Sequence, residues 1–109
     1  MLTQTLLRER LHYNPDSGVF TSKTRNIGRP VGSISADGYR RIDLFRKKYQ
    51  AHRLAYLYVE GQLPPDDMDV DHINGDRLDN RWVNLRLMPS SVNRGNLRER
   101  QLPLLESAK

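Results

Sequence analysis

The stretch from residue 69 to residue 98 holds the side chains of this sequence that could do chemistry together. Asp71 and His72 are adjacent, and Asn84 and Asn93 follow them in that order. A histidine near its ordinary pKa can take a proton from water. One carboxylate and one amide carbonyl are enough protein ligands for Mg²⁺, which keeps waters and takes substrate phosphate oxygens. The set therefore fits phosphodiester hydrolysis, which needs an activated water and a counter-charge for the phosphate.

These residues belong to a longer pattern. It consists of Asp-His-Ile-Asn-Gly-Asp at 71–76, Asn-Arg-x-x-Asn-Leu at 80–85 and Ser-x-x-Asn at 90–93. The pattern resembles the HNH endonucleases, also called ββα-metal or His-Me finger nucleases, and within them the small phage and intron-homing group. A weaker likeness to phage HNH proteins extends back to the N-terminus, through the segment Leu-His-Tyr-Asn-Pro-Asp-Ser-Gly at 11–18.

The resemblance implies a role for each of the four residues. His72 matches the general base, and Asp71 and Asn93 match the ligands of one divalent metal ion, Mg²⁺ or Mn²⁺. Asn84 matches the middle asparagine, which holds the loop and orients the base. The family would hydrolyse double-stranded DNA and leave 5′-phosphate and 3′-hydroxyl ends.

Other interpretations of these residues are weaker. Taken singly, an Asp-His pair is usually a surface or capping pair, and asparagines favour turns and caps. A calcium loop starting at Asp69 fails, because its fifth and sixth positions would be Ile73 and Asn74. A non-catalytic DNA-binding module of phage origin that keeps the HNH fold is the main alternative. A merely basic phage structural or packaging protein would leave the order of the motif unexplained.

The motif requires a particular local structure. Neighbours on a strand point to opposite faces, so Asp71 and His72 converge only if the strand ends or kinks beside them. The dipeptide Asn74-Gly75 is a tight-turn signal that supports such a break. We expect a strand at 68–71, a loop at 74–80, a strand at 84–88 and a helix from about Ser90. Ser90 is a good N-cap and would place Asn93 in the first helical turn.

The residues before the motif predict an α+β fold in which a small N-terminal antiparallel sheet with helices precedes the ββα-metal unit. We expect a helix at 3–12 capped by Thr3 or Thr5, with Leu7 and Leu11 on one face. Strands at 19–21, 38–45 and 49–51 would form a three-stranded sheet, with a loop at 23–33 and a turn at 46–48. A helix at 51–60 would end at Gly61.

Three further groups of side chains receive roles. Leu78, Trp82 and Leu85 are spaced to pack as one turn before the second strand, with Trp82 in the core. His52 lies outside the motif and is expected to be structural. The open face of the sheet, which resembles the DNA-binding domain of plant ethylene-response factors, and the motif itself supply the expected DNA contacts: Arg40, Arg41, Lys47, Lys48, Arg53, Arg86, Arg94 and Arg98.

Composition narrows the class of protein. The 109 residues carry a net charge of +5, which favours a polyanionic partner such as DNA. There is no cysteine, so we expect neither a disulfide nor a structural zinc site. No apolar run approaches the ~20 residues of a membrane span. We therefore expect no membrane partner and a cytoplasmic location, in the cell that hosts a phage or mobile element.

Length argues for one compact unit. Within it we expect a DNA-contacting support at 1–61, the nuclease motif at 62–98 and a tail at 99–109. One active site per chain is compatible with nicking, or with a homodimer that makes double-strand breaks. The target sequence and the biological role are not encoded in any pattern that we identify.

Overall fold

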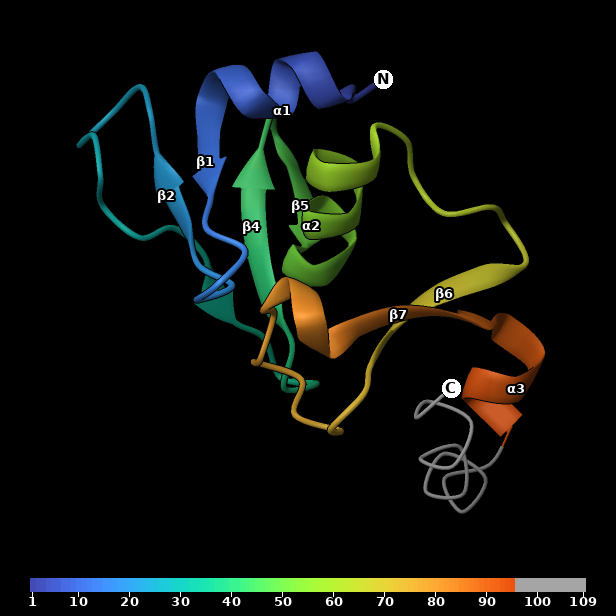
Figure 1. Ribbon diagram of the computed structural model, residues 1–109. Helices are drawn as coiled ribbons and strands as arrows, with labels where there is room; N and C mark the ends of the chain where they lie inside the picture. The colour runs from blue at the N-terminus through green and yellow to red at the C-terminus, as the bar shows by residue number, and fades with distance from the viewer. Residues whose placement is uncertain (96–109) are drawn as a thin grey trace.

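The computed structural model describes the backbone of residues 1–95 and the side chains of residues 1–92. Three small antiparallel sheets and three α-helices follow one another along this part of the chain. Figure 1 shows α1 and α2 beside the first two sheets, with the β6–β7 hairpin extending away toward α3. The order of the elements agrees with the expected α+β fold, in which a supporting region precedes a ββα unit.

The N-terminal helix is shorter than expected. Helix α1 spans Gln4–Arg10, and the Thr3 hydroxyl caps it by accepting from the Leu6 N–H. The prediction that the helix continues to residue 12 is wrong, because β1 (Leu11–Tyr13) begins at once and pairs with β2 (Phe20–Ser22). Strand alternation turns Leu11 and Tyr13 into the core together, which a helix could not do at this spacing.

The central sheet does not have the expected strands. It consists of β3 (Ser33–Ile34), β4 (Arg40–Leu44) and β5 (Lys47–Gln50), in that order. The expected first strand at 19–21 corresponds to β2, which pairs instead with β1 across the turn at residues 14–18. Strand β3 begins at the last residue of the segment we expected to be a loop. Its two residues are exposed and too few to show an alternating pattern.

The turn between β4 and β5 was also wrongly placed. Leu44 pairs with Lys47, so the turn residues are Phe45 and Arg46, and Lys47 and Lys48 belong to the strand. Both turn residues have positive φ, of 52° and 65°. Two-residue turns of this kind favour Asn-Gly, so the Phe-Arg pair gave no signal. The Arg10 guanidinium lies 4.6 Å from the centre of the Phe45 ring and packs α1 against this turn.

Helix α2 (Ala51–Glu60) agrees with the prediction at both ends. Gly61 ends it in the left-handed region, with φ of 89°, and donates its N–H to the Leu57 carbonyl. Leu54 and Leu57 are buried, and Tyr58 is half-buried against the rings of Tyr13 and Phe20.

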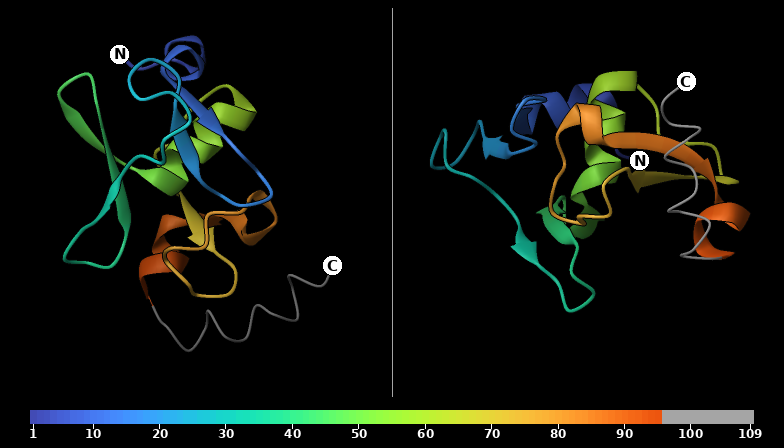
Figure 2. Two further views of the ribbon diagram at one scale, coloured as in Figure 1. Left: turned by 90° about the vertical axis from the view of Figure 1, so that its left-hand side faces the viewer. Right: turned by 60° about the horizontal axis from the view of Figure 1, so that its bottom comes forward.

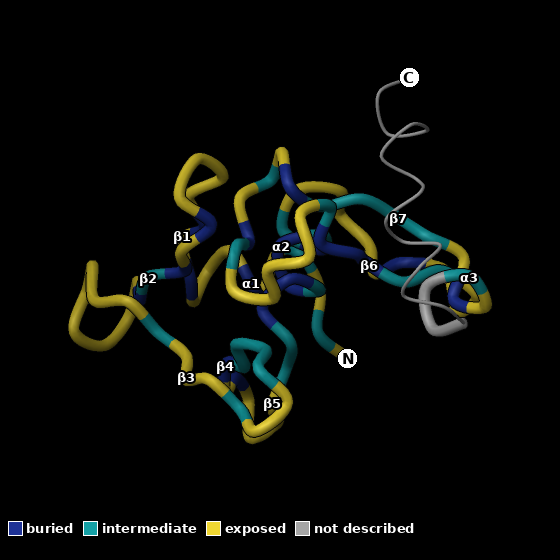
Figure 3. The backbone as a smooth tube through the Cα atoms, turned by 90° about the horizontal axis from the view of Figure 1, so that it is seen from below, coloured by how far each residue is buried: buried dark blue, intermediate teal, exposed yellow. Residues whose placement is uncertain are grey.

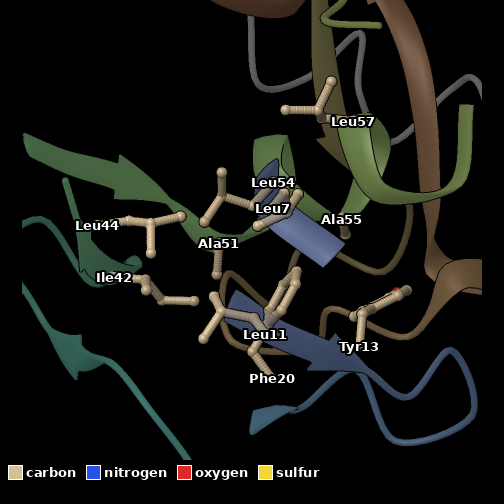
Figure 4. Packing of buried hydrophobic residues seen from close by; sticks show 10 residues of the cluster. All are labelled: Leu7, Leu11, Tyr13, Phe20, Ile42, Leu44, Ala51, Leu54, Ala55 and Leu57. Atoms are coloured by element: carbon tan, nitrogen blue, oxygen red, sulfur yellow. The ribbon is translucent and has the colours of Figure 1, made fainter. Parts of the chain in front are cut away.

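The core lies between α1, α2, the β1–β2 hairpin and β4, as Figure 4 shows. Ile42 and Leu44 come from one face of β4, because side chains two residues apart on a strand share a face. Figure 3 shows that the segment between β2 and β3 runs over the surface, so it adds little to this core. The cluster of buried residues consists of Leu7, Leu11, Tyr13, Phe20, Ile42, Leu44, Ala51, Leu54, Ala55 and Leu57.

The ββα unit contains β6 (Met68–His72), the 3₁₀ turn η1 (Trp82–Asn84), β7 (Leu85–Pro89) and α3 (Ser90–Gly95). The first strand includes His72, one residue beyond the prediction, and the second begins one residue later than expected. Leu78 is exposed and Trp82 is half-buried, so the proposed packing of these two residues with Leu85 is wrong. Polar bonds, described below, shape this loop instead. None of the described helices has the length and apolarity to cross a membrane.

The positive φ of Arg46 in the β4–β5 turn can be tested by substitution. Replacing Arg46 with glycine should raise the free energy of unfolding by about 0.5 kcal/mol. The strain of a non-glycine residue at positive φ disappears, and the greater freedom of glycine in the unfolded chain offsets part of the gain. The matched change Lys47→Gly, one residue later in β5, should lower it by about 0.5–1 kcal/mol. Urea denaturation of both variants measures the difference. Equal destabilisation by the two changes would contradict this turn.

Candidate active site

His72 lies at the end of β6, in contact with three other elements of the fold. Its side chain is buried, with 4% of its surface exposed. The Nε2 atom lies 2.7 Å from Asn80 Oδ1. The imidazole ring packs on His52 of α2, with 4.8 Å between the ring centres, and on Tyr39, at 6.0 Å. One edge of the ring is therefore fixed by a hydrogen bond and the remainder by aromatic contacts.

Asp71 is buried beside His72 in the sequence but has a different partner. Its Oδ2 atom lies 3.2 Å from Arg86 Nε, and Arg86 is the residue opposite it on β7. The expected convergence of Asp71 and His72 is not seen, because β6 continues regularly through both and neighbours on a strand take opposite faces. The expected turn does follow immediately, where Gly75 N–H donates to the His72 carbonyl.

Asn84 holds the loop between the two strands. Its side chain accepts from the Asn74 N–H at 3.0 Å and donates to the Asn74 side chain and to the Asp79 carbonyl. Its own carbonyl accepts from the Ile73 N–H at 2.8 Å. This geometry agrees with a loop-holding role, but the side chain that bonds His72 belongs to Asn80.

Asn80 is the site residue that the sequence analysis missed. Its side chain is 2% exposed, and the buried Tyr13 hydroxyl donates to its carbonyl at 2.6 Å. The available signal was the first asparagine of the Asn-Arg-x-x-Asn-Leu pattern, which lies eight residues from His72 along the chain. The pattern could not say that the loop folds back to bring this asparagine to the histidine.

The start of α3 is joined to the strand that carries Asp71. Ser90 N–H donates to the Asp67 carbonyl, and the Ser90 hydroxyl donates to Asp69 Oδ1 at 2.8 Å. The backbone of Asn93 lies in α3, as expected. The side chains of Asn93 and Arg94, and Arg98 as a whole, lie outside the described residues.

Comparison with known proteins points to the same class of protein as the sequence motif. Residues 49–94 match the family model described as HNH endonuclease. A solved structure described as "DNA binding and cleavage by the HNH homing endonuclease I-HmuI" matches with a TM-score of 0.63 and 28% sequence identity over 89% of this chain. Both findings support assignment of the stretch at 49–94 to the HNH endonuclease family. It spans 62% of the length of the I-HmuI chain in that structure. No curated protein sequence matches it closely enough to add a relative.

Nucleases of the HNH family generally use a divalent metal ion. The proposed ligands fit a hard cation, because a carboxylate and an amide both offer oxygen. Asp71 lies on β6, and Asn93 lies in α3, whose start is bonded to that strand. Within residues 1–92, no three His, Cys, Asp or Glu side chains form a metal-binding group. A site with one carboxylate and one amide would suit Mg²⁺, which keeps most of its waters. The Asp71–Arg86 ion pair already neutralises this carboxylate.

Among the described side chains, the expected DNA contacts Arg40, Arg41, Lys47 and Lys48 lie on the central sheet, and Arg53 and Arg86 lie on α2 and β7. Arg41 and Lys48 lie on the central sheet in ion pairs with Asp37 and Asp43. Arg40 also lies on this sheet and bonds the Gly32 carbonyl. Lys47 is exposed, whereas Arg53 on α2 is half-buried and Arg86 is committed to Asp71. The sheet therefore presents positive charge that is partly balanced by its own carboxylates.

His52, on α2, has a strongly lowered pKa. Burial lowers its pKa to about 3, and repulsion from His72, Arg53 and Arg41 acts in the same direction, against a weaker opposing effect of Asp69. His52 is therefore neutral at pH 7. This agrees with the expected structural role of His52, because its neutral ring packs against His72 without placing a charge beside it.

The shifted pKa of His52 predicts acid sensitivity. Its folded pKa lies below the ordinary value of 6.5, so the unfolded chain binds the extra proton between about pH 6.5 and pH 3, and stability falls as pH falls through that window. One proton changes the free energy of unfolding by about 1.4 kcal/mol per pH unit. Denaturation at pH 7, 6 and 5 should give a flatter dependence for His52→Gln than for the wild type. The exposed His12→Gln is the control. Identical slopes in all three proteins would contradict the assignment.

Proposed function

We propose that this chain is a metal-dependent DNA endonuclease that hydrolyses phosphodiester bonds at the end of β6. The observation that carries the proposal is that Asp71 and His72 occupy the last two positions of that strand, within the stretch that matches the HNH family. The similar solved structure is one of DNA binding and cleavage by I-HmuI, which supports the same class of substrate here.

In the proposed reaction His72 takes the proton from an attacking water. Its ring is held by the Asn80 side chain and by the rings of His52 and Tyr39, so that little reorganisation is needed when the proton arrives. The water oxygen bonds to phosphorus as the bond to the 3′ oxygen breaks, which leaves a 5′-phosphate and a 3′-hydroxyl. Asn84 acts indirectly in this proposal, by holding the loop that carries Asn80.

Asp71 and Asn93 would hold a divalent cation, Mg²⁺ or Mn²⁺, in this proposal. The ion would supply counter-charge for the phosphate and stabilise the leaving oxygen. Arg86 neutralises Asp71 and would also contact the phosphate in this proposal. The central sheet would bind the DNA backbone through Arg40, Arg41, Lys47 and Lys48, with Arg53, Arg94 and Arg98 as further candidates.

A second candidate function is a DNA-binding module that keeps the HNH fold without cleavage. Two observations favour it: Asp71 is already paired with Arg86, and the side chains of Asp71 and His72 are almost fully buried. A nuclease must expose both groups to water and phosphate. The two candidates share DNA binding and differ in metal-dependent hydrolysis.

A supercoiled-plasmid assay separates the two candidates. The wild type should convert supercoiled plasmid to open circles with Mg²⁺ or Mn²⁺ and not with EDTA, and His72→Ala should lower the rate by about 10²–10⁴-fold, the usual contribution of general-base catalysis. Direct linearisation would indicate paired active sites and a dimer.

The matched control for this assay is His12→Ala, because His12 is exposed on β1 and far from the motif in the sequence. It should leave the rate unchanged. Full activity in His72→Ala would overturn the role of the base. Tight DNA binding without cleavage of any DNA tested, with either metal, would favour the binding module.

The proposed ligand role of Asp71 has its own test. Mn²⁺ binding, followed by calorimetry in the absence of DNA, should weaken by about 10–100-fold or more in Asp71→Asn, since even changes outside the ligand shell cost that much. Asp43→Asn is the control, because Asp43 is a surface carboxylate paired with Lys48 on the central sheet. Equal Mn²⁺ affinity in the wild type and Asp71→Asn would remove Asp71 from the ligand set.

A further inference from the structure

We propose that Asn80 is a positioning residue for His72 and that the β1–β2 hairpin, residues 11–22, holds Asn80 in place. The importance of this arrangement for cleavage rests on the proposed function, but the arrangement itself can be tested without it. The hairpin lies outside residues 49–94, the stretch that matches the family. The proposal therefore extends the active-site structure to a part of the chain that the family match does not cover.

The bond between Asn80 and His72 determines the imidazole tautomer. Asn80 Oδ1 is an acceptor with no proton to give, so the His72 Nε2 atom 2.7 Å away must donate. The Nδ1 atom of the neutral ring then carries the lone pair. A general base needs its lone pair on the nitrogen that meets the attacking water, and with Nε2 bonded to Asn80 that nitrogen would be Nδ1.

The Asn80 backbone is held by a buried tyrosine. Tyr13 in β1 is 1% exposed, and its hydroxyl donates to the Asn80 carbonyl at 2.6 Å. Burial raises the pKa of Tyr13, and the nearby Asp79 carboxylate raises it further, so the phenol keeps its proton and stays a donor. A buried carbonyl without this donor would lack a partner that it needs.

The turn of the hairpin closes on the same segment. Trp82 N–H donates to the Pro15 carbonyl at 2.9 Å. Gly18, with φ of 76°, lies against the peptide bond from Asn80 to Arg81: a Cβ at this position would collide with the Asn80 carbonyl carbon and lie 2.5 Å from the Arg81 nitrogen. Figure 2 shows this turn beside the segment that leads into η1.

Three contacts from the hairpin thus converge on residues 80–82. The turn is itself shaped by polar bonds, since the Asn14 side chain accepts from the N–H groups of Asp16 and Ser17. Packing of the core requires Leu11, Tyr13 and Phe20 of the hairpin, but it does not require hydrogen bonds between the hairpin and a loop of the motif. Its contacts are directed at the residue that bonds His72.

The test is the tautomer of His72, read from long-range ¹H–¹⁵N NMR spectra at pH 7.5 without metal or DNA. The His72→Ala protein assigns the signals. Wild type should show the Nε2–H form. Asn80→Ala should shift His72 to a mixture of tautomers, and Asn80→Asp, which keeps an acceptor oxygen, should restore the Nε2–H form.

Two hairpin variants carry the second half of the proposal. Tyr13→Phe removes only the hydroxyl, and Gly18→Ala displaces the 80–81 peptide; each should perturb the His72 signals in the same direction as Asn80→Ala. Tyr58→Phe is the control, because Tyr58 packs against the same core, 5.7 Å from Tyr13 between ring centres, and its hydroxyl makes no hydrogen bond to Asn80 in the described part of the chain. In cleavage assays the hairpin variants should lower kcat about 10–100-fold, the scale of small misplacements, with KM for DNA little changed.

The possible results distinguish the roles of Asn80 and the hairpin from the proposed nuclease activity. A wild-type His72 in the Nδ1–H form, or an unchanged Nε2–H form in Asn80→Ala, would overturn the role of Asn80 even if the protein cleaves DNA. Unchanged His72 signals in folded Tyr13→Phe and Gly18→Ala proteins would overturn the role of the hairpin. The expected tautomer changes in a protein that cuts no DNA would support the arrangement and count against the proposed nuclease.

Discussion

The hydrogen bond between His72 and Asn80 is the constraint on which the arrangement of the motif depends. Both side chains are almost fully buried, and a buried polar group without a partner costs about 1–3 kcal/mol. The loop at 73–81 must therefore fold back far enough for Asn80 to reach the ring. Asn84 secures this path through Asn74 and the Asp79 carbonyl, and Tyr13 secures its end. The polar groups of the loop are thus satisfied by one another and by the hairpin, which explains how a loop with an exposed Leu78 can still have a defined shape.

The other contacts of His72 join the central sheet to the same point. Tyr39 lies just before β4, and its ring contacts both His52 and His72. The Arg77 guanidinium lies 5.0 Å from the centre of the Tyr39 ring and donates to the Asp37 carbonyl, so the loop of the motif is held against the turn before β4. A sheet that binds DNA and a histidine that acts on it would then share one aromatic contact. The neutral state of His52 allows this packing, because a charged ring between Tyr39 and His72 would be costly to bury.

The sequence predicted the parts of this fold that local patterns control. Helix α2 had an apolar stripe and a glycine at its end, and β4 alternated regularly, so their positions agreed with expectation. The partners of the strands were not predictable in the same way. Strand β2 could have paired with either neighbour, and the bonded turn at 14–18 together with the packing of Tyr13 and Phe20 into one core favours β1. The same holds for the candidate site: the motif pointed to Asp71, His72 and Asn84 as candidates, whereas the contact of Asn80 with His72 depends on a loop conformation that no periodicity encodes.

The Asp71–Arg86 ion pair would affect how tightly a metal ion binds at the proposed site. A carboxylate that is 3% exposed is expensive to leave unpaired, so Arg86 on the facing strand compensates its charge when no cation is present. A divalent cation on Asp71 would place positive charge next to the guanidinium, and the two would repel one another unless a further anion arrived. A DNA phosphate is such an anion, and it could accept from Arg86 while contacting the metal. On this argument, metal and DNA would bind the proposed site more tightly together than either would alone.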